Sequence, residues 1–231
     1  MRWFMRCLMA FGLILSLVIP AGAEEVQSLP PVQTINSVNE RLVITVDGIP
    51  IAACRGQWET FNRNYTVCNY YGDIPELGYQ KGDTIEFVTH DGFLYLRRNS
   101  ETRWMRTEDI FYDPSVTFSA YLVAFPEPFT VSNLGSRTIG SVPTTQYQLW
   151  SRNAEFNGTG QLTQDLFIGN DGWIYGSNFS DRSSFGENRT VDFYSTYSDF
   201  NSAIKVYPPV SSSVDGTDYT LTALERMLVQ R

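Results

Sequence analysis

Residues 164–175 read QDLFIGNDGWIY and hold the strongest local fold signal of the chain. Two runs, 164–168 and 173–175, flank the sequence Gly169-Asn170-Asp171-Gly172. An Asp-Gly pair tolerates the positive φ angles that a tight hairpin turn needs. This stretch therefore predicts a β-hairpin.

The rest of the chain has the same character. Short alternating or aromatic runs are separated by Gly, Asn, Asp and Pro, which is typical of a β-rich protein. We expect further strands at 42–46, 84–89, 93–97, 103–105, 145–150, 190–197 and 204–207. The last of these is stopped by Pro208-Pro209, because proline lacks the N–H that a sheet requires.

Two helices are expected to interrupt the strands. In the first, Asp113 is the expected cap, and the apolar positions Phe118, Tyr121, Leu122 and Phe125 follow helical spacing until Pro126 ends the helix. The second lies at the C-terminus, where Asp218 would cap a helix with an apolar stripe of Leu221, Leu224 and Leu228. The fold class is therefore α+β and mostly β.

The N-terminus has the layout of a signal peptide. Two arginines in residues 1–6 precede an apolar run from 7 to 20, and Ala21-Gly22-Ala23 supplies small residues before a cleavage point. We expect a signal peptide at 1–23, a flexible leader at 24–36 and a single domain at 37–231. The product would be soluble after cleavage, without a stable membrane span, and secreted or held in a periplasm or cell envelope.

Export would place Cys54 and Cys68 in an oxidising compartment, which favours a disulfide between them over two buried thiols. Two cysteines and the single histidine, His90, cannot make a four-ligand zinc site by themselves. We therefore expect no metal and no cofactor.

Charge and motifs argue against two large function classes. The chain has 17 basic and 25 acidic residues, and this negative balance repels nucleic-acid phosphates. His90 lies in a predicted turn and no nucleophile motif accompanies it, so no catalytic residue is assigned. The carboxylates that a glycosidase would use mostly flank turns, where acids are common for conformational reasons: Asp165, Asp171, Asp181, Glu187 and Asp192.

Apolar and aromatic side chains are the chain's main surplus. They either fill a core between helix and sheet or line a cavity there, and hydrophobic walls suffice to hold an acyl chain. The candidates for such a ligand cavity are Phe118, Tyr121, Leu122, Phe125, Tyr147, Leu149, Trp173 and Tyr175.

From residue 84 to 209 the order of motifs resembles the LolA/LppX/LprG-like superfamily of exported lipid and lipoprotein carriers. The matching pieces are DGFLYLR (91–97) followed by Trp104, GSVPTTQY (140–147), QDLFI (164–168) with NDGW (170–173), and YSDFN (197–201) leading to IKVYPP (204–209). The resemblance implies a curved antiparallel sheet, a half-open β-barrel, with one or two helices on its concave face. It assigns no functional residue, because the family's ligand sites are cavity walls.

We therefore expect an exported, non-catalytic protein that holds a lipid or another apolar small molecule between sheet and helices, with an envelope lipoprotein as a further partner. The alternative is an extracellular carbohydrate- or surface-binding module that uses exposed tryptophans: Trp58, Trp104, Trp150 and Trp173. A purely structural or sensor ectodomain has no positive sign in the sequence.

Overall fold

The fold is mostly β. The computed structural model describes residues 24–73, 79–99, 101–109, 112–125, 128–151, 162–181 and 190–218. In order along the chain, these ranges form β1 (Glu24–Val26), β2 (Val38–Val46), β3 (Ile49–Thr60), β4 (Arg63–Tyr70), β5 (Thr84–His90), β6 (Phe93–Arg98), β7 (Trp104–Glu108), α1 (Phe118–Val123), β8 (Phe129–Ile139), β9 (Val142–Ser151), β10 (Leu162–Gly169), β11 (Ile174–Asp181), β12 (Val191–Ser198), the 3₁₀ turn η3 (Ser211–Ser213) and β13 (Val214–Asp218).

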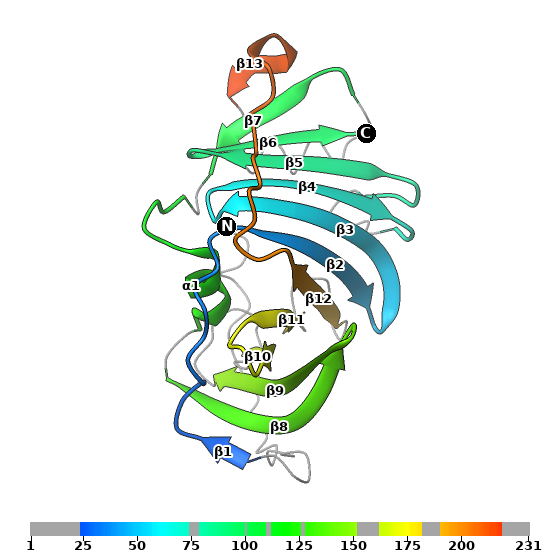
Figure 1. The fold of residues 1–231 in the computed structure, drawn as a ribbon. Coiled ribbons are helices and arrows are strands. Elements are labelled where there is room, and N and C mark those ends of the chain that lie inside the picture. The colour runs from blue at the N-terminus through cyan, green and yellow to red at the C-terminus, as the bar shows by residue number, and fades with distance from the viewer. Residues whose placement is uncertain are drawn as a thin grey trace.

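The strands form one curved sheet (Figure 1). Their order is β1-β8-β9-β10-β11-β12-β2-β3-β4-β5-β6-β7-β13, and every neighbouring pair is antiparallel except β7 and β13. The pairing of β12 with β2 joins the later strands to the earlier ones, and α1 packs on the concave side. The expected curved antiparallel sheet with a helix on its concave face is therefore confirmed.

The hairpins form where the turn residues tolerate positive φ. Asp47 and Gly48 have φ angles of 51° and 77°, and Asp91 and Gly92 have 46° and 89°. These pairs join β2 to β3 and β5 to β6. The expected hairpin of β10 and β11 is present as well, with Gly172 at a φ of 82° and a register shift at Phe167/Ile168.

The helix α1 is shorter than expected and has a different cap. Thr117, not Asp113, caps it by accepting a hydrogen bond from the Ala120 N–H at 3.1 Å. Asp113 instead accepts the Ser115 N–H at 2.9 Å in the preceding turn. The helix ends at Val123, and the following Ala124 is extended.

Two further expectations differ from the structure. Residues 204–207 form no strand, because the Val206 N–H donates to the Glu59 carboxylate at 3.0 Å instead of to a neighbouring strand. The 24–36 segment, expected to be a flexible leader, contains β1 and the fully buried Ile35. The signal peptide at 1–23 and the C-terminal helix lie outside the described residues.

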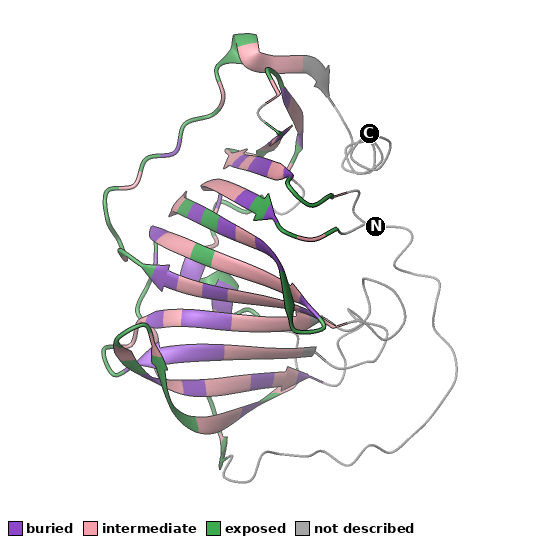
Figure 2. Cartoon of the chain, turned by 90° about the vertical axis from the view of Figure 1, so that its right-hand side faces the viewer, coloured by how far each residue is buried: buried purple, intermediate pink, exposed green. Residues whose placement is uncertain are grey.

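Burial follows the pleat of the strands. Figure 2 shows buried and half-buried residues along the middle of the sheet and exposed residues at the turns. The face that contacts α1 is the inner face of the sheet. The opposite face is its outer face.

Candidate functional site

The inner face carries two hydrophobic clusters. The first cluster spans β2 to β6 and β12, with the buried residues Val46, Ile51, Ala52, Cys54, Cys68, Tyr70, Ile85, Leu96 and Val191. The second cluster lies under α1, with the buried residues Ile35, Val38, Phe118, Leu122, Leu149, Leu166, Ile168, Ile174 and Tyr197.

The helix α1 fills the second cluster. Phe118 is 1% exposed, and its ring centroid lies 4.9 Å from that of Trp58 and 5.4 Å from that of Tyr197. Leu122 is 4% and Leu149 0% exposed. These three residues, expected either to line a cavity or to fill a core, are packed in a core.

The other five sequence-derived candidates surround that core. Phe125, Tyr147 and Trp173 are half-buried and pack against the second cluster. Tyr175 is half-buried, and its ring contacts Phe200 at 5.3 Å. Tyr121 is 52% exposed, with its ring 4.8 Å from that of Phe61.

The first cluster contains no residue of α1. Five half-buried hydrophobic residues from the strands pack against it: Leu42, Ile44, Phe87, Met105 and Phe193. Sequence reasoning missed this surface, although the alternation of Leu42, Ile44 and Val46 is visible in the sequence. The expected disulfide between Cys54 and Cys68 is confirmed and lies within the cluster, joining β3 to β4 with a Cα–Cα distance of 4.0 Å.

A row of cross-strand neighbours lies at the border of the two clusters. It consists of Tyr197, which also belongs to the second cluster, with Glu40, Gly56 and Thr66, on β12, β2, β3 and β4, and together they are the polar row. On β2 the row lies between Val38 of the second cluster and Leu42 beside the first. Sequence reasoning missed it, because its members come from four strands.

Glu40 is the charged member of the polar row. Its carboxylate accepts hydrogen bonds from Trp58 Nε1 at 3.0 Å and Ser195 Oγ at 2.7 Å. Burial raises its pKa above the usual value of 4.5, although these two bonds act in the opposite direction. Burial and then the charge of Glu40 also raise the pKa of Tyr197, whose hydroxyl is 2.8 Å from Ser177 Oγ.

A cleft of about 300 Å³ opens beside the start of α1, between the β3–β4 turn and residues 112–117. Arg63 in its wall donates two hydrogen bonds to Asp91, at 2.7 and 2.8 Å. The Arg63 bond is the main cause of the lowered pKa of Asp91. The charge of this arginine is therefore paired within the protein.

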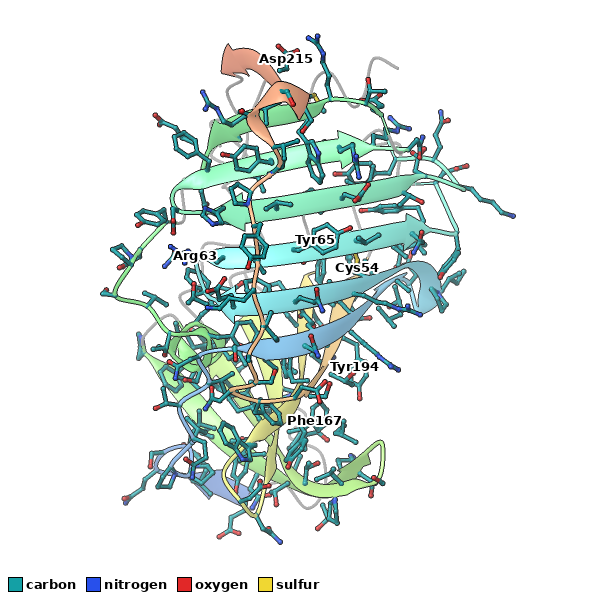
Figure 3. All side chains as sticks on the ribbon, turned by 45° about the horizontal axis from the view of Figure 1, so that its top comes forward. Cys54, Arg63, Tyr65, Phe167, Tyr194 and Asp215 are labelled. Atoms are coloured by element: carbon teal, nitrogen blue, oxygen red, sulfur yellow. A yellow bond between two sulfur atoms is a disulfide. The ribbon has the colours of Figure 1, made fainter. Side chains whose placement is uncertain are left out.

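The outer face is crossed by residues 202–210 (Figure 3). Val206 packs there with Val88 and Trp104, and half-buried Tyr65 lies against them. Arg97 lies 4.5 Å from the centroid of the Trp104 ring. Farther down the outer face, the rings of Phe167 and Tyr194 meet at 6.2 Å (Figure 3).

His90 and the carboxylates weighed as catalytic groups contact other side chains of the protein. His90 lies 3.4 Å from the carboxylate of Asp91. Asp165 accepts from Gln148 at 3.1 Å, Asp171 from Tyr175 at 2.7 Å, and Asp192 from Ser180. The Asp181 side chain and Glu187 lie outside the described residues.

Two searches of the described ranges were negative. They hold no group of three or more His, Cys, Asp or Glu residues placed to bind a metal ion. None of the helices in these ranges has the length and apolar character of a membrane span.

No protein-family profile and no curated protein matches the chain. Solved structures similar to it include LprF from Mycobacterium bovis, at 14% identity and a TM-score of 0.47 over 76% of this chain and 90% of that chain. The Mycobacterium tuberculosis lipoprotein LppX matches at 11% identity and a TM-score of 0.48, over 75% of this chain and 90% of its own. A LolA superfamily protein from Nitrosomonas europaea matches at 10% and 0.30, over 77% and 90%. These similar structures include LppX and a LolA superfamily protein, at TM-scores below 0.5.

Proposed function

We propose that the chain is an exported, non-catalytic binding protein that holds a lipid or another apolar molecule on the inner face of its sheet. The observation that carries this proposal is the division of the inner face. The helix α1 covers the second cluster, whereas the first cluster contains no α1 residue and has half-buried hydrophobic side chains around it. Each CH₂ group of a guest buried there would contribute about 0.8 kcal/mol.

The first cluster, not the core under α1, is the binding surface in this proposal. The sequence-derived candidates Phe125, Tyr147 and Trp173 would border the ligand at most, because they pack against the second cluster. Leu42, Ile44 and Phe193 would contact the hydrocarbon directly. A lipid or the acyl chain of an envelope lipoprotein has the required chemistry.

The tryptophans give little support to a carbohydrate-binding module. Trp104 is buried beneath Arg97, and half-buried Trp58 packs against Phe118. Trp173 is stacked on Phe200, with ring centroids 4.8 Å apart and an interplanar angle of 8°. Trp150 is half-buried. Trp104, Trp58 and Trp173 thus each have a ring face covered by another side chain, which leaves less of these rings for sugar stacking.

Displacement of a fluorescent fatty acid tests the proposal, together with native mass spectrometry of the gently purified protein. Ile44→Asp places a charge on the inner face, and Val43→Asp places the same charge on the outer face of the same strand; both positions are half-buried. We expect wild type and Val43→Asp to bind the probe, and Ile44→Asp to lose it while unfolding cooperatively. Neither copurified lipid nor probe binding in the wild type would refute the proposal.

A further inference from the structure

The polar row places a carboxyl group between apolar residues of the inner face. A carboxyl group on an apolar face carries a desolvation penalty, and apolar residues of similar volume often replace buried charged groups without loss of stability. Glu40 is nevertheless in this position, between Val38 and Leu42 on the inner side of β2. It therefore calls for a role other than stability.

The arrangement around Glu40 leaves it able to accept more hydrogen bonds. An ionised carboxylate has about four acceptor sites, and a protonated carboxyl group keeps part of this capacity. Trp58 donates to Oε2 and Ser195 to Oε1, one donor to each oxygen. Glu40 and Thr66 are half-buried residues of β2 and β4, and neither is fully enclosed.

Gly56 makes room for this cluster. A methyl group on Gly56 would lie 3.0 Å from Trp58 Nε1, 3.1 Å from Glu40 Oε2 and 3.2 Å from Thr66 Oγ1. Three polar atoms thus converge over Gly56. Along the same two strands, the next pair on this face is Cys54 and Cys68 of the first cluster. An alanine in place of Gly56 would require the ends of the Trp58, Glu40 and Thr66 side chains to shift by a few tenths of an ångström.

We propose that the polar row binds the uncharged hydroxyl head group of an amphiphile whose hydrocarbon chain lies along the first cluster. This inference rests on the proposed function and adds the class of ligand. A ligand hydroxyl donates to Glu40 and accepts from Thr66 Oγ1, while the tail contacts Leu42 and Phe193. Burial raises the pKa of Glu40 and so disfavours its charged form, which makes a hydroxyl a better partner than an ammonium group.

The test compares two ligands with the same acyl chain, monooleoylglycerol with hydroxyl groups and methyl oleate without them. Competition with a fluorescent fatty acid gives their affinities for wild type, Glu40→Leu and Gly56→Ala. Asp165→Leu is the control, because Asp165 is a carboxyl with a pKa raised by burial on the outer face. Urea unfolding of each variant confirms that it is folded.

We expect wild type and Asp165→Leu to bind monooleoylglycerol about tenfold more tightly than methyl oleate, the equivalent of one good hydrogen bond. In Glu40→Leu and Gly56→Ala the ratio should fall towards one. An unchanged ratio in both variants would overturn the head-group assignment and leave apolar binding intact. Tighter binding of oleylamine than of monooleoylglycerol to wild type would also overturn the head-group assignment. Failure of every ligand to displace the probe would overturn the proposed function itself.

Discussion

The packing of Phe118 under α1 makes the sharpest quantitative prediction. The side chain is 1% exposed, and its ring contacts those of Trp58 and Tyr197 at 4.9 and 5.4 Å. Replacing a buried Phe by Ala costs about 3–5 kcal/mol through lost burial and the cavity left behind. Both ring contacts lie in the favourable distance range for aromatic pairs. Phe118→Ala should therefore lower the free energy of unfolding by about 4 kcal/mol.

Urea unfolding followed by tryptophan fluorescence and far-ultraviolet circular dichroism measures this loss. With a slope of about 2 kcal/mol/M, the midpoint should fall by about 2 M. Tyr121→Ala on the same helix is the control, because Tyr121 is 52% exposed and should cost less than about 1 kcal/mol. If Phe118→Ala does not fold, Phe118→Leu keeps most of the volume and should lose only about 1 kcal/mol.

The opposite result has a defined meaning. A loss below about 1 kcal/mol for Phe118→Ala would show that the space under α1 is loosely packed. The second cluster would then be a cavity wall, and our placement of the ligand on the first cluster would be refuted. In the packed case, the new apolar cavity should bind benzene, which would restore part of the lost stability.

Three further predictions concern other parts of the sheet. Replacing Cys54 and Cys68 together by Ser should lower the free energy of unfolding by about 3 kcal/mol, because the cross-link restrains the unfolded chain. Reduction of the wild type should lower the melting temperature by a similar amount, and an unchanged melting temperature in both cases would contradict this. The pKa of Glu59 is lowered chiefly by the hydrogen bond from the Val206 N–H and then by Lys205. The stabilisation from these contacts is therefore present above pH 4.5 and is lost as the pH falls through the folded pKa. At pH 7, Glu59→Gln should speed hydrogen exchange of the Val206 amide, and equal exchange rates in the two proteins would count against a stabilising role of this hydrogen bond. The pKa of Glu40 is raised, so the desolvation penalty of its carboxylate is absent below pH 4.5 and grows as the pH rises through the folded pKa. The free energy of unfolding of wild type, relative to that of Glu40→Gln, should therefore fall over this pH range. If the difference in free energy of unfolding between the two proteins does not change with pH, Glu40 titrates normally.

Local signals in the sequence predicted the hairpins correctly. The turn of β5 and β6 depends on Asp91 and Gly92, which are adjacent in the chain and supply the positive φ angles themselves. Cys54 and Cys68 are only 14 residues apart, and their pairing needed only an oxidising compartment as an assumption. Such features depend on neighbours in sequence, so one sequence suffices to find them.

Features that depend on distant residues were missed or misread. Residues 204–207 have the pattern of a strand, but the Val206 N–H meets Glu59, 147 residues earlier in the chain. The polar row requires the register of β12 on β2, in which Tyr197 faces Glu40. No local pattern reveals that register. The sequence-derived cavity candidates therefore came from the helix segment and from Tyr147, Leu149, Trp173 and Tyr175, and they did not include the strands of the first cluster.

The division of the inner face also determines which substitutions can separate binding from folding. Leu122→Arg is the obvious disruption if α1 is a cavity wall, but Leu122 is 4% exposed and an unpaired arginine there should unfold the protein. Loss of ligand in that variant would say nothing about where the ligand binds. Ile44 and Val43 are adjacent on β2, both half-buried and on opposite faces, so the same substitution tests the two faces of one strand. If both variants unfold cooperatively, a binding difference between them points to the face on which the ligand lies.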